Sequence, residues 1–287
     1  MSSIIRNGVE FTGATPEDVT VVAFAERAIS DIDGNKLPDT YFKKEGFKKG
    51  GLYGANLYNS IFRGKDITNY FTDGSLYTRI SSGEFTDLYV GDYFKATING
   101  TDITCRIAGF DIYLNQGPHG KDLVQHHAVI VPDQALMHAA MNDTNITTGG
   151  YVGSKMYTTT LVTINSQLEA VFGSHLLTVR ERLSRAVDAS TGVSSASRWF
   201  DSIADLMTEV EVYGTRVWSS SSNDFGTGMK QLPLFMLAPE FIIPGRFSWW
   251  LRAVVSSTGF ADVSYDGGAG HHAASNSLGV RPRWLIG

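Results

Sequence analysis

The sequence has a single cysteine among its 287 residues, Cys105. One thiol excludes an internal disulfide and any metal site built from several cysteines. Residues 103–107 read as a β-strand, in which Cys105 would be a small apolar group. We therefore expect Cys105 to lie in the core.

Charge is also scarce: Asp, Glu, Lys and Arg make up 18% of the residues, and the net charge is −5. This composition offers neither a basic stripe for nucleic acid nor a polybasic patch for a membrane surface. The sequence lacks an apolar run of about eighteen residues, and residues 1–7 lack the pattern of a secretory signal. We expect no nucleic-acid partner, no membrane insertion and synthesis in a cytoplasm.

The first fifty residues differ from the rest. Residues 15–18 resemble a helix start, yet residues 19–24 alternate nearly as a strand would, and both interpretations stay open. Residues 43–51, rich in Lys and Gly, are typical of a solvated linker. The composition change predicts an N-terminal segment of residues 1–50 and a domain of residues 51–287. Apolar residues make up 43% of the whole chain, which is enough to support a core.

Short, mixed elements are expected in the larger domain, which predicts an α+β fold. Asn99-Gly100 predicts a hairpin turn. The expected strands are residues 85–90, 93–98, 103–113, 127–131, 250–255, 260–265 and 280–286. The expected helices are residues 134–141, 164–172 and 178–187, and the expected polar loops are residues 190–197 and 219–222.

Two pairs of adjacent histidines, His126-His127 and His271-His272, suggest metal binding. Adjacent side chains on a strand point to opposite faces, so each pair offers only one ligand to a common site. We therefore expect no metal and no other cofactor. For His126 and His127 we expect one buried and one exposed imidazole, and for His271 and His272 a pair of surface contacts.

Catalytic patterns are weak. Residues 149–155 are glycine-rich but lack the spacing of a phosphate-binding loop. Glu209 and Glu211 would share one face of a strand, as a glycosidase pair or as a solvated face, and the solvated face is the more common arrangement. An enzyme is therefore the weaker hypothesis.

The last forty residues have two aromatic and Arg-rich ends around a polar middle. Trp249, Trp250 and Arg252 begin this segment, and residues 279–284, Gly-Val-Arg-Pro-Arg-Trp, close it. Aromatic and cationic side chains at both ends can pin neighbouring strands, while small residues between them tolerate replacement. We expect Trp250 and Trp284 in the core, and Arg252 and Arg281 bonded to carbonyls or a carboxylate of the scaffold.

Several of these segments together resemble a family of bacteriophage and prophage proteins. The resemblance spans roughly residues 50–287 and rests on residues 56–63, 106–111, 126–127, 250–252 and 279–282. The C-terminal part is similar to the C-type-lectin-like fold of phage tropism determinants and of the variable proteins of diversity-generating retroelements. In those proteins variable positions sit on a fixed scaffold. The Glu-Pro-Asn and Trp-Asn-Asp strings of calcium-dependent lectins are absent here, so calcium-mediated sugar binding is not implied.

Residues 28–35 and 39–44 are similar to segments near the attachment regions of phage tail fibres. The resemblances imply a virion protein, assembled in a bacterial cytoplasm, whose N-terminus binds other virion proteins. A homotrimer that recognises a bacterial surface glycan or protein is implied as well. The alternatives are a capsid decoration or head-fibre protein and a glycan-active enzyme.

The residues expected to contact the ligand lie between or beside the scaffold anchors and combine flat faces with polar edges. They are Phe247, Ser248, Ser257, Thr258, Ser264, Tyr265, Asp266, His271, His272, Asn276 and Ser277.

Overall fold

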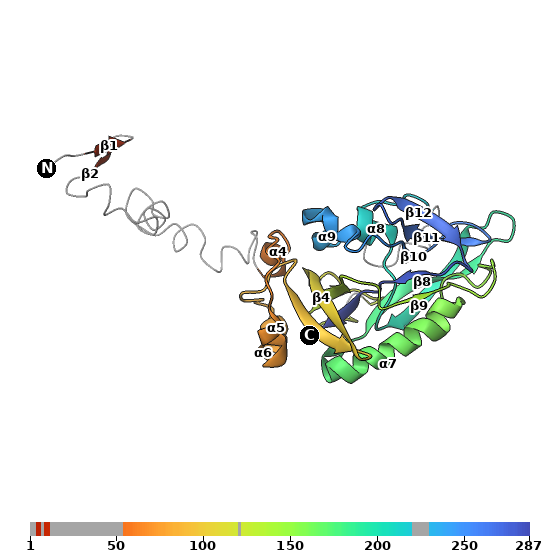
Figure 1. The fold of residues 1–287 in the computed structure, drawn as a ribbon, viewed down its shortest axis with the longest axis horizontal. Coiled ribbons are helices and arrows are strands. Elements are labelled where there is room, and N and C mark those ends of the chain that lie inside the picture. The colour runs from red at the N-terminus through yellow and green to blue at the C-terminus, as the bar shows by residue number, and fades with distance from the viewer. Residues whose placement is uncertain (1–3, 7–8, 12–53, 120–121, 220–229) are drawn as a thin grey trace. The chain divides into compact units, whose positions relative to one another are not determined.

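The computed structural model describes residues 4–6, 9–11, 54–119, 122–219 and 230–287 (Figure 1). The chain divides into two units, Met1–Tyr53 and Gly54–Gly287, and the boundary expected after residue 50 lies close to this division. In the first unit, β1 (Ile4–Arg6) pairs antiparallel with β2 (Val9–Phe11). Three predictions fall wholly or partly outside the described residues. They are the helix or strand at residues 15–24, the linker at 43–51 and the polar loop at 219–222, of which only Ser219 is described. Attachment through the N-terminus stays a prediction.

The second unit contains an antiparallel five-stranded sheet in the order β3-β4-β5-β14-β7. Every residue of β5 is buried, which agrees with its continuously apolar sequence, and the last six residues of β4 are buried as well. The strands are β3 (Tyr93–Ile98), β4 (Thr101–Phe110), β5 (Ala128–Pro132), β7 (Leu176–Leu177) and β14 (Trp284–Ile286).

Helices cover this sheet. A π-helical turn, Met156–Thr160, continues into α7 (Leu161–Phe172), which contacts β3 and β7 and ends in a 3₁₀ turn, Gly173–His175. Phe172 on α7 contacts Phe94 and Trp284, with ring centroids 6.2 and 5.9 Å apart. Between Gly54 and β3 the structure has the short helices α4 (Ala55–Tyr58), α5 (Thr68–Thr72) and α6 (Ser75–Ser81).

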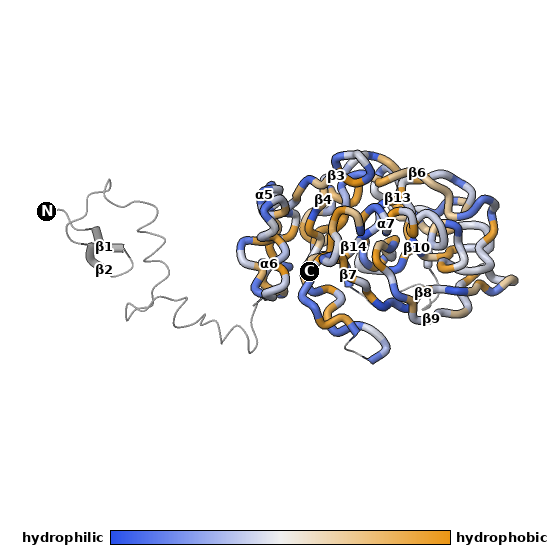
Figure 2. The backbone as a smooth tube through the Cα atoms, turned by 90° about the horizontal axis from the view of Figure 1, so that it is seen from below, coloured by the Kyte–Doolittle hydropathy of each residue, from blue (hydrophilic) through white to orange (hydrophobic). Residues whose placement is uncertain are grey.

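A second five-stranded sheet has the order β12-β11-β10-β13-β6, and only its β10–β13 pair is parallel. A separate hairpin joins β8 (Val179–Val187) to β9 (Ser194–Ser202), and the short helices α8 (Glu209–Tyr213) and α9 (Pro233–Leu237) follow, the latter leading into a 3₁₀ turn, Pro239–Ile242. The second sheet contains β6 (Met137–Ala139), β10 (Trp249–Val254), β11 (Gly259–Val263), β12 (Ala269–Ala273) and β13 (Leu278–Val280). Apolar and polar stretches alternate along the whole unit (Figure 2).

Most strands agree with the sequence analysis, and the mixture of helices and strands confirms an α+β fold. Strand β3 has the predicted bounds, and Asn99 and Gly100 both adopt the left-handed conformation that a tight hairpin turn requires. Cys105 is buried in β4 as predicted, and α7 occurs where a helix over 164–172 was expected.

Other predictions were wrong. Residues 85–90 form turns with one isolated bridge at Val90, because Phe85 and Asp87 have positive φ angles. Residues 134–141 contain strand β6 rather than a helix, residues 178–187 form strand β8, and the loop expected at 190–197 ends where β9 begins. In β8 Leu183 and Val187 are spaced four apart as on one face of a helix, but buried Glu181 and Arg252 pair across the core, so tertiary contacts override the local pattern.

A buried ion cluster ties the two sheets and the hairpin together. Arg252 on β10 donates to Glu181 on β8 (2.5 Å) and to Asp205 (2.9 Å), and Arg283 beside β14 pairs with Glu181 (2.6 Å). The fifth member of the cluster, Glu211 on α8, lies 3.4 Å from the Arg283 Nε atom. All five side chains are at most 4% exposed. This cluster confirms that Arg252 bonds to carboxylates of the scaffold.

Arg281, Trp250 and Trp284 also have the predicted roles. The Arg281 Nε atom donates to the Pro132 carbonyl (2.7 Å), and its guanidinium lies 5.0 Å from the centre of the Trp249 ring. Trp249, Trp250 and Trp284 are fully buried, and the Trp250 indole donates to the Ala139 carbonyl (2.9 Å). The two Arg-rich and aromatic ends are therefore scaffold.

The ion cluster holds three carboxyl groups against two guanidiniums. Burial raises the pKa of Asp205 to about 6, assisted by nearby Glu181, although Arg252 and Arg283 oppose the shift. Burial acts in the same direction on Glu181, but the same two guanidiniums outweigh it and hold its pKa below the usual value. The excess carboxyl is therefore Asp205, which retains its proton to a higher pH in the folded state than in the unfolded state.

Replacing Asp205 by Asn should change how stability depends on pH. A raised folded pKa contributes stability that is fully present below the unfolded value of 3.8 and is lost as the pH rises through about 6. The difference in free energy of unfolding between the parent and Asp205→Asn should therefore shrink as the pH rises across this window. Urea denaturation at a series of pH values measures the difference, and a difference that grows with pH would contradict the assignment.

Candidate ligand-binding surface

The segment that follows α8 is held in place by a buried carboxylate. Glu209 is 1% exposed and accepts hydrogen bonds from the backbone N–H groups of Val217 (3.2 Å), Trp218 (2.8 Å) and Ser219 (2.9 Å) and from the Ser219 hydroxyl (2.6 Å). Four donors offset the cost of burying a carboxylate. Glu209 therefore fixes the backbone of residues 217–219.

Trp218 is exposed, yet its ring is oriented. The indole Nε1 donates to the Ala269 carbonyl at the start of β12 (3.0 Å), and the ring meets the His271 imidazole edge to face, with centroids 4.4 Å apart. With its backbone N–H on Glu209, Trp218 is anchored at both ends. A flat aromatic side chain, 45% exposed, thus stands against an edge of the second sheet.

The two histidines of β12 point to opposite faces, as expected for adjacent strand residues. His271 is exposed and contacts Trp218, whereas the half-buried His272 bonds through Nδ1 to the fully buried Asp262 on β11. Burial raises the pKa of the Asp262 carboxyl, and the hydrogen bond to His272 acts in the opposite direction. His272 is thus partly a scaffold residue, because its loss would leave a buried carboxyl without that partner.

The turns of the second sheet divide the predicted contact residues between two ends. Ser264, Tyr265 and Asp266 lie in the β11–β12 turn, directly after Val263. Val263 pairs with Trp249, which directly follows Phe247 and Ser248, so these two residues lie at the same end of the sheet as the turn. Their end of the sheet also carries Ala269, the anchor of Trp218.

At the opposite end, Ser257 and Thr258 connect β10 to β11. The connection from β12 to β13, which carries Asn276 and Ser277, starts beside them, since the Ala274 N–H donates to the Thr258 carbonyl (2.8 Å). The eleven predicted residues therefore do not form one surface.

Exposure differs among these residues. Tyr265 is 64% exposed, and Asp266, Ser257, Thr258, Asn276 and Ser277 are exposed as well. Phe247 is half-buried and lies against Gly279, where an added Cβ would come within 2.8 Å of its ring. Phe247 is thus a packing residue, and Tyr265 and His271 are the exposed rings of the predicted set near Trp218.

Glu209 and Glu211 do not occupy a solvated strand face, which corrects the expectation from the sequence. Both are buried on α8, where Glu211 forms a capping box with Thr208 and accepts a hydrogen bond from Tyr113. Their oxygens serve the backbone, Tyr113 and Arg283, so the arrangement does not resemble a carboxylate pair flanking a substrate.

His126 and His127 differ in exposure as predicted: the His127 side chain is fully buried and that of His126 is 40% exposed. Within the described ranges, no group of three or more His, Cys, Asp or Glu side chains is placed to hold a metal ion. The described helices include none with the length and apolar character needed to cross a membrane.

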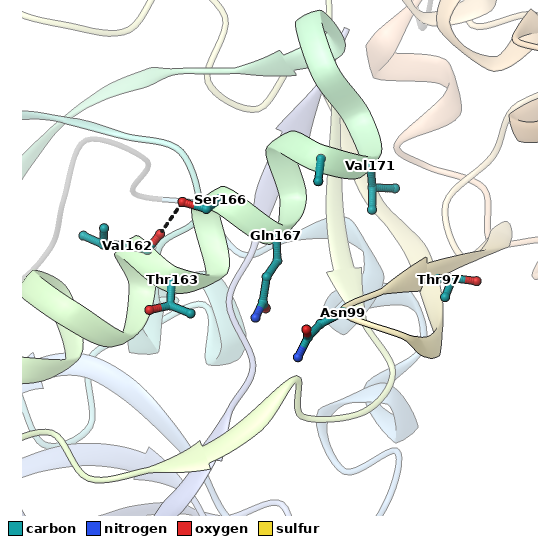
Figure 3. A pocket seen from close by; sticks show the side chains of 8 residues that line it. Thr97, Asn99, Val162, Thr163, Ser166, Gln167 and Val171 are labelled. Atoms are coloured by element: carbon teal, nitrogen blue, oxygen red, sulfur yellow. Dashed lines mark hydrogen bonds between the residues drawn. The ribbon is translucent and has the colours of Figure 1, made fainter.

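An open groove lies between α7 and the β3–β4 hairpin (Figure 3). Its lining has hydroxyl, amide and aliphatic side chains but no ionisable group, so it offers no acid or base. The lining residues are Thr97, Asn99, Val162, Thr163, Ser166, Gln167, Ala170 and Val171.

Sequence reasoning missed Trp218 and assigned Glu209 to the wrong kind of element. Trp218 lies outside the C-terminal polar segment in the sequence. Only its contacts with the distant residues Ala269 and His271 place it beside strand β12. Glu209 carried a usable signal, because Thr208-x-x-Glu211 is the pattern of a capping box and indicates a helix start. Comparisons of the chain with family models, curated proteins and solved structures find no match.

Proposed function

We propose that this chain is a phage virion protein of the tail fibre or baseplate that attaches the particle to a bacterial surface molecule. The observation that carries the proposal is a pair of exposed rings in contact, Trp218 and His271, at the edge strand β12, with the exposed Tyr265 in the adjoining β11–β12 turn. The supporting scaffold contains buried Trp side chains and the buried Arg252 and Arg283, which form ion pairs with Glu181. Rigid, amphipathic rings on turns supply contact area at low entropic cost.

The C-type-lectin-like fold and the homotrimer remain parts of this proposal. The resemblance of the C-terminal residues to phage tropism determinants supports the first. Repetition of a small binding surface in a trimer supports the second, since several weak sites on one particle raise its avidity. Light scattering of the full chain tests the trimer, and a concentration-independent monomer would contradict it.

The surface can be tested with the double variant Tyr265→Ala/His271→Ala. We expect it to lose binding to those bacterial strains, from a panel, that the fluorescently labelled full chain binds, while the free energy of unfolding changes by less than about 1 kcal/mol. Flow cytometry measures binding, and thermal denaturation measures stability.

Ser257→Ala/Thr258→Ala at the opposite end of the sheet is the matched control and should bind as the parent does. His272 is left intact because of its bond to Asp262. Full binding by the Tyr265→Ala/His271→Ala variant would refute a contact surface at this end.

A further inference from the structure

We propose that Trp218 is a stacking platform for a sugar ring, so that the ligand of the adhesion surface is a carbohydrate. The inference rests on the proposed function and names the chemical class that the site would take. It adds a contact residue outside the C-terminal polar segment.

The first argument is the cost of the arrangement. Among the described residues Glu209 forms no ion pair, and the four hydrogen bonds that it accepts there come from residues 217–219. Burying a carboxylate to order a short surface segment costs free energy, which neutral packing would avoid. The burial of Glu209 results in one fixed, exposed indole, that of Trp218. Such pre-organisation reduces the entropy lost on binding.

The second argument is the orientation of the indole. Its N–H is used by the Ala269 carbonyl and one side meets His271, so what remains for a ligand is apolar ring surface. An aromatic face carries partial negative charge and attracts the polarised C–H groups on the apolar face of a sugar. The neighbouring imidazole of His271 and the carboxylate of Asp266, both exposed, supply polar edges of the kind that hydroxyl groups need.

The third argument is the size of the apolar area. In the described part of residues 214–219 and 255–277, the large apolar side chains that are strongly exposed are Val217, Trp218 and Tyr265. A stable protein partner typically buries about 800 Å² of each surface around a desolvated apolar core. Isolated rings among Ser, Gly, Asp and His fit a narrow, hydroxyl-rich ligand better than a broad protein interface.

The test uses the labelled full chain and whole cells of each bound strain, treated either with periodate, which cleaves vicinal diols of sugars, or with proteinase K. Binding should be lost after periodate and kept after proteinase. Trp218→Ala should weaken binding about ten-fold or more, and Trp218→Phe, which keeps an aromatic face, should retain most of it. Val162→Ala, an equally exposed position on α7, is the control and should bind normally.

The outcomes separate the two proposals. If the chain binds no strain of the panel, the adhesion function fails and this inference fails with it. If it binds, but binding survives periodate and is lost after proteinase, the ligand is a protein and the inference alone is overturned. Parental binding by Trp218→Ala also overturns it. Should Trp218→Ala melt well below the parent, Trp218→Leu replaces it, and the inference then requires that Leu binds less tightly than Phe.

Discussion

Trp284→Ala is expected to lower the free energy of unfolding by about 3–5 kcal/mol. Trp284 is fully buried on β14, the strand that pairs with both β5 and β7, and its ring contacts Phe172 of α7. Truncation would leave a cavity between the sheet and the helix, and dense packing leaves few ways to fill it. Denaturation in urea, monitored by circular dichroism, measures the loss.

A pair of conservative variants separates packing from hydrogen bonding. Within the described part of the chain the Trp284 indole N–H has no hydrogen-bond partner, whereas that of Trp250 donates to the Ala139 carbonyl. Trp284→Phe should therefore cost less than Trp250→Phe, which also leaves a carbonyl oxygen without its donor. A Trp284→Ala variant as stable as the parent would mean that this ring is not part of the central core.

The C-terminal scaffold could be predicted from the sequence because its signals are local. Trp249, Trp250 and Arg281 are bulky or cationic groups next to strand-like runs, and such side chains either pack or pair wherever the strands meet. The hairpin at Asn99-Gly100 is equally local, since the turn needs two residues that tolerate positive φ.

The errors concern elements whose structure depends on distant partners. Residues 179–183 alternate in burial as a strand paired with β9, and the buried Glu181 is matched by Arg252 and Arg283, which are far away in the sequence. His271 and His272 were expected in a polar stretch, but β11 pairs with them and makes them strand residues. The predicted ligand-contact residues were treated as one surface because the strand pairing could not be read from the sequence. Successive turns of an antiparallel sheet lie at opposite ends of its strands.

The candidate site was predicted in part. Tyr265 and His271 are both exposed; His271 contacts Trp218 from the middle of β12, and Tyr265 lies in the turn that precedes β12. His272 and Phe247 have packing roles that only the cross-strand neighbours Asp262 and Gly279 show. A residue's exposure on a strand depends on register, which a polar sequence specifies weakly.

Arg283→Met should destabilise the protein by about 3–5 kcal/mol, because it leaves buried Glu211 without its cation and buried Glu181 with Arg252 alone. Arg283 is fully buried, pairs with Glu181 at 2.6 Å, and donates to the Tyr113 hydroxyl at 2.9 Å. Methionine preserves much of the side-chain volume, so the loss would report the missing charge and hydrogen bonds rather than a cavity. Urea denaturation at neutral pH measures the change.

An exposed ion pair of the β8–β9 hairpin provides the matched control. Arg180 on β8 pairs with Asp201 on β9, but their side chains are 42% and 60% exposed, and an exposed pair of this kind contributes about 0–1 kcal/mol. Arg180→Met should therefore leave stability nearly unchanged. Lowering the pH should reduce the cost of Arg283→Met, because Arg283 is one of the two guanidiniums that hold the pKa of Glu181 below its usual value, and the stability gained from that lowered pKa is lost as the pH falls. Equal losses for Arg283→Met and Arg180→Met would show that the buried cluster does not stabilise the fold, and a loss independent of pH would show that charge is not its cause.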